Sequence, residues 1–154
     1  MIEIKKCSKK FGKHEVLQNI NLSFHKGECI ALIGPNGCGK TTLIKSILGM
    51  VIPDSGSVEF NNKSIFGDYL YRENIGYMPQ IGRYPDNMTI GQIIEMIKKI
   101  RNSEQALDED LINAFELEKM FLKQMRTLSG GTTQKVSAAL AFLFNPEVLI
   151  LDEP

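Results

Sequence analysis

A glycine-rich stretch between residues 34 and 42 combines the residue types that proteins use to bind phosphate groups. From Gly34 to Thr41 it fits the pattern G-x-x-x-x-G-K-[ST]. Glycines let successive backbone N–H groups point at phosphate oxygens. Lys40 can reach the β- and γ-phosphates, and the Thr41 hydroxyl can ligate Mg²⁺. This stretch is named the phosphate loop, and its residues are Gly34, Pro35, Asn36, Gly37, Cys38, Gly39, Lys40, Thr41 and Thr42.

The elements expected on either side of the loop have the order that phosphate binding requires. The apolar run 29–33 predicts a buried strand of a parallel sheet before the loop. Apolar residues at helical spacing predict a helix after it, which ends near Leu48 with Gly49 as its cap. The positive N-terminal end of that helix would face the phosphates. This context favours phosphate binding over the alternative, a glycine-rich turn in which the lysine is a coincidence.

Two carboxylates follow a second apolar run near the end of the sequence. Residues 148–151 predict a buried strand, and Asp152 and Glu153 come directly after it. Asp152 can hold the shell of a Mg²⁺ ion, and Glu153 can polarise a water molecule beside a γ-phosphate. Adjacent carboxylates at a strand end are otherwise ordinary surface charges. A phosphate loop earlier in the chain favours the catalytic interpretation.

A second glycine turn, Leu128-Ser129-Gly130-Gly131, stands in front of a segment with a helical pattern, 132–144. A glycine turn at a helix N-terminus is a potential anion site. The sequence by itself leaves a simpler alternative open, in which the turn only caps the helix.

The remaining pattern predicts an α/β chain. An antiparallel ribbon and further short strands are expected at 2–4, 15–24, 57–60 and 75–80. Thr89 and Gln92 form a capping-box pair in front of one helix. A second helix is expected over 107–117.

Composition points to one globular domain and restricts the classes of function. The 154 residues are 43% apolar and carry 18 basic and 18 acidic side chains, so bulk charge argues neither for nor against nucleic acid. No apolar run is long enough to span a bilayer, and the first residues do not resemble a signal peptide. Cys7, Cys29 and Cys38 are widely spaced, which fits reduced cytosolic thiols rather than disulfides or a zinc site.

Four motifs in a fixed order carry a resemblance that covers the whole sequence. They are GPNGCGKTT at 34–42, Gln80 after IGYMP, LSGG at 128–131 and VLILDEP at 148–154. Together they are similar to the nucleotide-binding domain of an ABC (ATP-binding cassette) transporter. The resemblance implies a P-loop NTPase of the α/β class, with a mostly parallel core sheet, an N-terminal antiparallel β subdomain and a helical insert.

The same resemblance implies a single ATP-binding domain over 1–154. Its parts would be a nucleotide-binding core with the β subdomain at 1–80, a helical subdomain at 83–126, and the signature helix with the carboxylate strand at 127–154. Relatives continue with a strand that lies between those carrying Lys40 and Asp152, and with a switch histidine. We therefore expect a gap in the sheet, and no meaningful ATP hydrolysis by residues 1–154 alone.

Residue roles follow from the resemblance, position by position. Phe11 would stack on adenine, and a loop aromatic that packs on the ribbon is the alternative. Gln80 would touch Mg²⁺ and the attacking water. Ser129, Gly130 and Gly131 would bind the γ-phosphate of the opposite subunit's ATP. The implied catalytic residues are Lys40, Gln80 and Glu153, and the implied Mg²⁺ contacts are Thr41, Gln80 and Asp152.

The implied function is that of the ATP-binding subunit of an ABC transporter. Two such subunits would enclose two Mg·ATP molecules head to tail and drive a separate transmembrane permease. The resemblance implies no nucleic-acid partner, and a cytoplasmic position at the inner face of the membrane. The helical insert would dock on the permease. Its methionines suit adaptable contacts or are ordinary core residues; they are Met88, Met96, Met120 and Met125.

Soluble ABC-type ATPases of DNA maintenance or translation are the alternative. The DNA-associated class carries long coiled coils between the glutamine and signature motifs, and the segment from Gln80 to Ser129 has no room for one. The translation-associated class joins two cassettes by a basic linker, whereas this chain has one cassette and no net charge. Within transporters, the segment IGRYPDNMTIGQ is similar to ATPase subunits of copper handling and nitrous-oxide-reductase maturation.

Two positions in or directly after the motifs are distinctive in this chain. Thr132 stands where the signature usually continues with glutamine, which is expected to weaken contacts at the dimer interface. Cys38 lies in the phosphate loop near a helix N-terminus, where thiols tend to become reactive. It is a candidate redox-sensitive point, or else an unreactive small residue that fills the loop.

Overall fold

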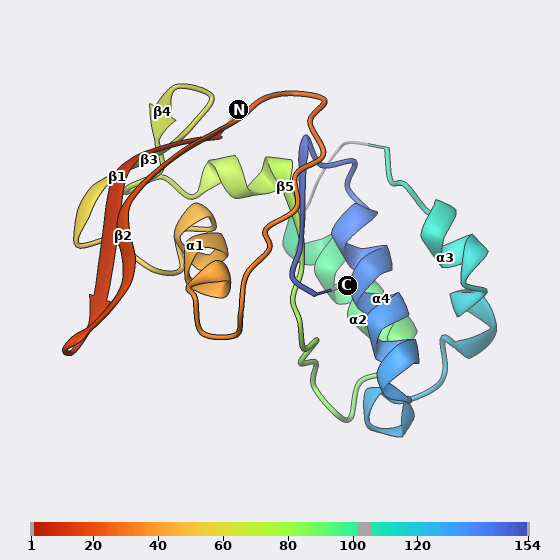
Figure 1. Cartoon of the computed structure of the whole chain (residues 1–154). Helices are drawn as coiled ribbons and strands as arrows, with labels where there is room; N and C mark the ends of the chain where they lie inside the picture. The colour runs from red at the N-terminus through yellow and green to blue at the C-terminus, as the bar shows by residue number, and fades with distance from the viewer. Residues whose placement is uncertain (1, 102–105, 154) are drawn as a thin grey trace. The chain divides into compact units, whose positions relative to one another are not determined.

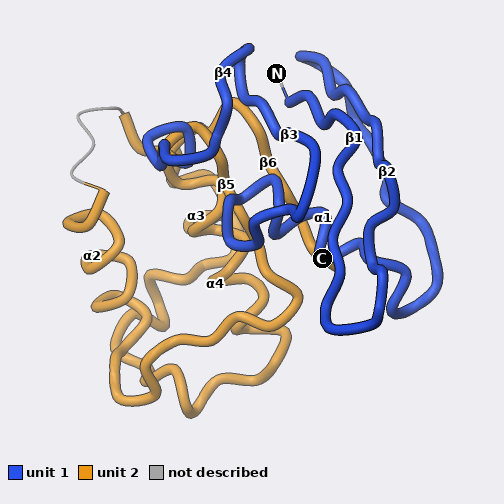
Figure 2. The backbone as a smooth tube through the Cα atoms, turned by 90° about the vertical axis from the view of Figure 1, so that its left-hand side faces the viewer, with its two compact units in different colours: residues 1–72 blue, residues 73–154 orange. Residues whose placement is uncertain are grey.

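The computed structural model describes residues 2–101 and 106–153. The chain forms two compact units, Met1–Arg72 (unit 1) and Glu73–Pro154 (unit 2), which Figure 2 shows in different colours. Each unit has its own β-sheet and its own buried apolar residues.

Unit 1 is built on a four-stranded antiparallel sheet (Figure 1). Its strands are β1 (Ile2–Phe11), β2 (His14–Phe24), β3 (Ser55–Phe60) and β4 (Lys63–Ser64), in the order β2-β1-β3-β4. Asn61 and Asn62, between β3 and β4, have positive φ angles of 49° and 61°. Two positive φ angles are typical of the two-residue turn whose twist matches that of hairpin strands. Strand β1 pairs antiparallel with β2, so the antiparallel ribbon predicted from the alternating residues is confirmed.

One helix, α1 (Lys40–Ile47), follows the phosphate loop in unit 1, as the spacing predicts. Its apolar face is buried, and the Tyr71 hydroxyl donates to the Ile47 carbonyl oxygen at 3.0 Å. Tyr71 belongs to the short 3₁₀ helix η1 (Leu70–Asn74). The chain leaves α1 through Gly49, whose φ of 64° is left-handed, as expected of a helix cap.

The strand predicted immediately before the phosphate loop is not formed. Residues 29–33 have no regular secondary structure, and the side chains of Ile30 and Ile33 are 51% and 91% exposed. A strand is held by backbone hydrogen bonds to a neighbouring strand, and neither sheet of the described residues includes this segment. The prediction of a buried parallel strand at 29–33 is therefore wrong.

Unit 2 holds the parallel pair β5 (Ile75–Met78) and β6 (Val148–Leu151), in register from Ile75 opposite Val148 to Met78 opposite Leu151. Among the described residues, these two strands make up the parallel part of the predicted core sheet. Helix α4 (Gly130–Phe142) packs on β5. A side chain at Gly76 would collide with the Ala141 carbonyl oxygen, so glycine at this position lets the strand and the helix lie close together.

The rest of unit 2 is helical and packs around one apolar core. Its elements are α2 (Ile90–Arg101), α3 (Asp110–Ala114), η2 (Leu117–Met120) and η3 (Met125–Thr127). The core consists of Ile90, Ile93, Ile94, Ile112, Leu117, Met125, Val136, Ala139, Leu143 and Phe144. Met88, Met96 and Met120 pack against it, which favours the core interpretation of the methionines. No helix in the described ranges is long and apolar enough to cross a membrane.

Local signals determine where the helices of unit 2 begin and end. The N–H of Thr89 donates to Gln92 Oε1 at 2.9 Å, and the N–H of Gln92 donates to Thr89 Oγ1 at 3.3 Å, so the capping box is confirmed. The single helix expected over 107–117 is wrong in extent. Its chain turns at Glu116, where a left-handed φ of 52° separates α3 from η2. Helix α4 begins at Gly130, slightly earlier than its apolar pattern indicates.

Replacing Ile93 with alanine should strongly destabilise unit 2, because the Ile93 side chain is fully buried in the helical core. The variant loses the transfer free energy of the removed atoms and gains a cavity, at a cost of about 2–5 kcal/mol. The matched control is Ile100→Ala on the same helix, where the side chain is 71% exposed. Urea unfolding measures both variants, and equal midpoints would contradict this packing.

Candidate functional site

The phosphate loop in unit 1 is an exposed segment that leads into the N-terminus of α1. The N–H of Cys38 donates to the Pro35 carbonyl oxygen at 3.3 Å and closes a turn. Gly37 and Gly39 have φ angles of 80° and 99°, which favour glycine. A side chain at Gly39 would also lie 2.7 Å from the Val16 carbonyl oxygen on β2. Both the backbone conformation and the available space therefore require glycine at position 39.

Lys40 folds back over this loop. Its Nζ donates to the carbonyl oxygens of Gly34 at 2.7 Å and Pro35 at 3.0 Å, and it lies 4.0 Å from Cys38 Sγ. Sulfur is a weak acceptor, so a phosphate oxygen would attract the ammonium more strongly than the thiol does. The lysine is thus held at the loop, with one N–H donor that an anion can take.

The first turn of α1 adds backbone donors to the loop. It begins at Lys40 and contains Thr41 and Thr42, which are both half-buried. N–H groups in a first turn lack an intrahelical acceptor, and the helix dipole makes this end positive. This turn holds no acidic side chain that would compete for the positive end. The loop, the helix start and Lys40 together present the backbone donors and the positive charge that suit an anion.

Phe11, the last residue of β1, has 52% of its surface exposed. Lys9 Nζ lies 5.5 Å from the centroid of its ring, which is a cation–π distance. The ring is thus partly covered by the ribbon and partly open to a planar ligand. This geometry is compatible with adenine stacking and with a structural role.

In unit 2, Asp152 directly follows β6 and is only 5% exposed. Its N–H donates to the Met78 carbonyl oxygen at 2.9 Å, which extends the pairing of β5 and β6. Burial raises the pKa of Tyr77 on β5, and the charge of Asp152 and a hydrogen bond to it raise this pKa further. The tyrosine therefore stays protonated to a higher pH than an ordinary tyrosine does.

Sequence reasoning missed Tyr77 as a neighbour of Asp152. The signal that could have found it is the register of the two predicted strands, which sets Tyr77 opposite Ile150. That register depends on pairing between distant parts of the chain, so the sequence of either strand alone does not contain it.

Gln80 and Glu153 meet beyond the ends of β5 and β6. Gln80 Nε2 donates to Glu153 Oε2 at 2.6 Å, a short distance of the kind seen with charged acceptors. Glu153 adopts a left-handed φ of 54°, which is uncommon outside glycine. Both side chains are exposed, so water can reach them. The structure thus brings together two residues that the resemblance assigns to the attacking water.

The second glycine turn, Leu128-Ser129-Gly130-Gly131, is named the signature turn, and it caps α4. Ser129 is the N-cap residue, and its Oγ accepts the N–H of Thr132 at 3.3 Å. Gly130 and Gly131 are exposed, and a side-chain carbon at either would meet no atom within 4 Å. The turn is therefore a helix cap that also leaves a helix N-terminus open to an anion, so the two interpretations of the sequence are compatible.

The predicted site residues divide between the two units. The phosphate loop and Phe11 lie in unit 1, whereas Gln80, the signature turn and both carboxylates lie in unit 2. Pro154, the last residue of the VLILDEP motif, lies outside the described residues.

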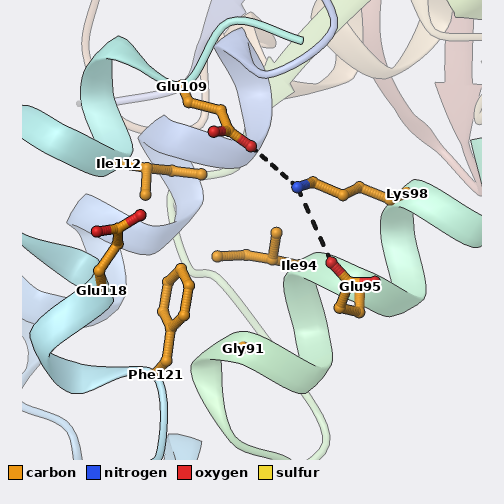
Figure 3. Close-up of a pocket in the computed structure, with 8 residues that line it drawn as sticks. All are labelled: Gly91, Ile94, Glu95, Lys98, Glu109, Ile112, Glu118 and Phe121. Carbon is orange, nitrogen blue, oxygen red and sulfur yellow. Dashed lines mark hydrogen bonds and ion pairs between the residues drawn. The ribbon is translucent and has the colours of Figure 1, made fainter.

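A pocket of about 200 Å³ in unit 2 involves none of these residues (Figure 3). It is lined by Gly91, Ile94, Glu95, Lys98, Glu109, Ile112, Glu118 and Phe121. Lys98 Nζ lies 3.0 Å from a Glu109 oxygen and 3.9 Å from a Glu95 oxygen. The Lys98–Glu109 pair connects α2 to the start of α3, whereas the Lys98–Glu95 pair lies within α2. The pocket therefore lies where these two helices of unit 2 meet.

Comparison with known proteins gives the same family as the motifs. The family model described as ABC transporter matches residues 17–154. The sulfate/thiosulfate import ATP-binding protein CysA of Pectobacterium atrosepticum is 37% identical over 162 residues, which cover 99% of this chain and 49% of CysA. The zinc import ATP-binding protein ZnuC of Vibrio vulnificus is 36% identical over 157 residues, which cover 100% of this chain and 55% of ZnuC. The chain spans about half the length of these curated relatives.

Solved structures share the fold. An ATP-binding subunit of an ABC transporter matches with a TM-score of 0.86 at 29% identity, over 97% of this chain and 65% of the other. A dimeric ATP-binding cassette in a post-hydrolysis state, bound to ADP and Pi, matches with a TM-score of 0.84 at 25% identity, over 98% and 73%. The fold class that the motifs predict is thereby confirmed. With the motifs, the family model and the solved structures in agreement, the chain belongs to the ABC transporter family.

Proposed function

We propose that this chain belongs to the ATP-binding subunit of an ABC transporter, and that the full-length protein hydrolyses ATP to drive transport through a separate membrane permease. The observation that carries the proposal is the position of Lys40 over the phosphate loop at the N-terminus of α1. Family membership supports it, as do relatives named as import ATP-binding proteins. Residues 1–154 then form one ATP-binding domain, divided into 1–80, 83–126 and 127–154.

The phosphates of ATP are held by backbone donors and by one lysine. The N–H groups of the phosphate loop and of the first turn of α1 surround the β- and γ-phosphates. Lys40 contributes a positive charge that is already held at the loop by two carbonyl oxygens. Phe11 presents its exposed ring to the adenine.

The donors of this chain also fit Mg²⁺, which prefers oxygen ligands. Thr41, Gln80 and Asp152 offer a hydroxyl, an amide and a carboxylate oxygen. In the described part of the chain, no three His, Cys, Asp or Glu side chains form a metal cage. Mg²⁺ usually keeps several waters and phosphate oxygens as ligands. When bound, Mg²⁺ neutralises charge on the phosphoryl group during transfer.

Glu153 accepts a proton from the water that attacks the γ-phosphate. The water forms the new bond to phosphorus, and the bond to the bridging oxygen of ADP breaks. Gln80 occupies Oε2 of Glu153 in this structure. Because a carboxylate has two oxygens, Oε1 remains available to the water. Gln80 then aligns the same water from the neighbouring strand end.

A second ATP-binding subunit completes each site in the proposed assembly. Ser129, Gly130 and Gly131 of one subunit contact the γ-phosphate held by the other, which their exposure at the N-terminus of α4 supports. The helical part, 83–126, docks on the permease. The protein is then peripheral at the cytoplasmic face of the membrane and has no nucleic-acid partner.

Replacing Lys40 with alanine should weaken Mg·ATP binding by at least about tenfold, because a charged hydrogen bond to phosphate is lost. The matched control is Lys45→Ala, which removes an exposed lysine in the last turn of the same helix. Titration calorimetry on the full-length protein measures both affinities. Equal ATP affinity for Lys40→Ala and the parent protein would refute the assignment of the loop.

Replacing Glu153 with glutamine should leave ATP binding intact and slow turnover by about 10²–10⁴-fold, because the proton acceptor is removed while the shape is kept. ATP should then accumulate in a stable dimer. The control is Glu147→Gln, which alters an exposed carboxylate just before β6. Phosphate release by the full-length variants is the measurement. Turnover of Glu153→Gln within a few-fold of the parent would assign the proton acceptor elsewhere.

Alkylation of Cys38 should block ATP binding, and bound Mg·ATP should protect this thiol, because Cys38 Sγ lies 4.0 Å from Lys40 Nζ in the loop. Cys29 is also an exposed free thiol and serves as the internal control. Mass spectrometry after treatment with iodoacetamide gives both rates. The prediction fails if nucleotide leaves the rate at Cys38 unchanged relative to that at Cys29.

A further inference from the structure

Thr132 and Ser129 are joined by two close contacts at the start of α4. The N–H of Thr132 donates to Ser129 Oγ at 3.3 Å, and the two hydroxyl oxygens lie 2.9 Å apart, where either can donate. The neighbouring Thr133 bonds differently, because its hydroxyl donates to the Ser129 backbone carbonyl at 3.2 Å. Only Thr132 therefore reaches the Ser129 side chain with its own hydroxyl, among the contacts of this turn in the described residues.

The number of hydrogen-bonding positions on a hydroxyl determines what this pair can offer to an anion. A serine hydroxyl has one donor and two acceptor positions. One acceptor position of Ser129 is filled by the N–H of Thr132. When the Thr132 hydroxyl donates to the second acceptor position, the hydroxyl hydrogen of Ser129 points away from both donors of Thr132. Ser129 is exposed, so this hydrogen is free to face the surface.

A phosphate oxygen accepts hydrogen bonds and donates none, so a bound phosphate selects the orientation in which Ser129 donates outward. Hydrogen bonds in a row also polarise one another. A serine that accepts from Thr132 is therefore a stronger donor than a serine hydroxyl alone. Gly130 and Gly131 leave the space beside it open.

We propose that Thr132 is a positioning residue that turns the Ser129 hydroxyl outward, as a donor to the γ-phosphate of the partner subunit's ATP. This inference rests on the proposed function, which places Ser129 at that phosphate. It reverses the expectation from the sequence that Thr132 weakens the dimer interface.

The test measures ATP-driven dimerisation of the full-length protein in a Glu153→Gln background, by sedimentation velocity with Mg·ATP. Thr132→Val keeps the branched shape and removes the hydroxyl, and it should raise the dimer dissociation constant about tenfold. Thr132→Ser restores the hydroxyl and should stay within about twofold of the parent, which separates loss of the hydroxyl from misfolding. Thr133→Val is the matched control, because it removes a hydroxyl that bonds the Ser129 carbonyl instead, and it should stay within about threefold.

A double variant distinguishes action through Ser129 from a separate role. In a Ser129→Ala background, Thr132→Val should cause no further weakening, because the hydroxyl that it orients is gone. Equal losses in both backgrounds, or a parent-like dimer for Thr132→Val, would overturn the inference and leave the proposed function standing. A parent protein that does not dimerise with Mg·ATP would overturn the proposed function and this inference together.

Discussion

Parallel pairing of β5 with β6 is the constraint on which the polar chemistry of unit 2 depends. Parallel strands end at the same edge of a sheet, and the register here sets Met78 opposite Leu151. The residues that follow β5 and the residues that follow β6 therefore leave the sheet at the same edge. The backbone hydrogen bond from Asp152 to Met78 continues the pairing by one step, and the bond between Gln80 and Glu153 closes it. Two carboxylates and an amide are thus brought together by backbone geometry.

In unit 1, the position of the Lys40 charge is set by residues that are close to it in the sequence. The residues before the loop form no strand, yet the loop has a defined turn, a glycine that the backbone requires at Gly39, and a lysine held by two loop carbonyl oxygens. These features depend on residues within one short stretch and on the helix that follows. A phosphate-binding geometry of this kind needs aligned N–H groups and a helix N-terminus rather than burial.

Sequence alone predicted the features that depend on near neighbours. The capping box of Thr89 and Gln92 and the left-handed cap of α1 at Gly49 involve residues within about one helical turn, and both are present. The prediction of a strand at 29–33 is wrong because an apolar run indicates a tendency to be buried but does not supply a partner strand.

The candidate site shows the same division between local and distant information. The loop, the carboxylates and the signature turn could be named from their motifs. The contact of Tyr77 with Asp152 could not, because it depends on the pairing of strands far apart in the sequence. The hydroxyl pair of Ser129 and Thr132 is an intermediate case between these two. A spacing of three residues at an N-cap is a recognisable local signal, although the motifs alone did not identify this contact.

Binding of ATP phosphates by the backbone of residues 34–42 is the claim on which the proposed chemistry depends. Hydrogen–deuterium exchange of these amides, with and without saturating Mg·ATP, tests it without any substitution. We expect exchange across the loop and the first turn of α1 to slow when ATP binds, because their N–H groups become bonded to phosphate oxygens. Exchange at the Asn61-Asn62 turn should stay unchanged and serves as the reference. Loop amides that exchange at the same rate with and without Mg·ATP would contradict the claim.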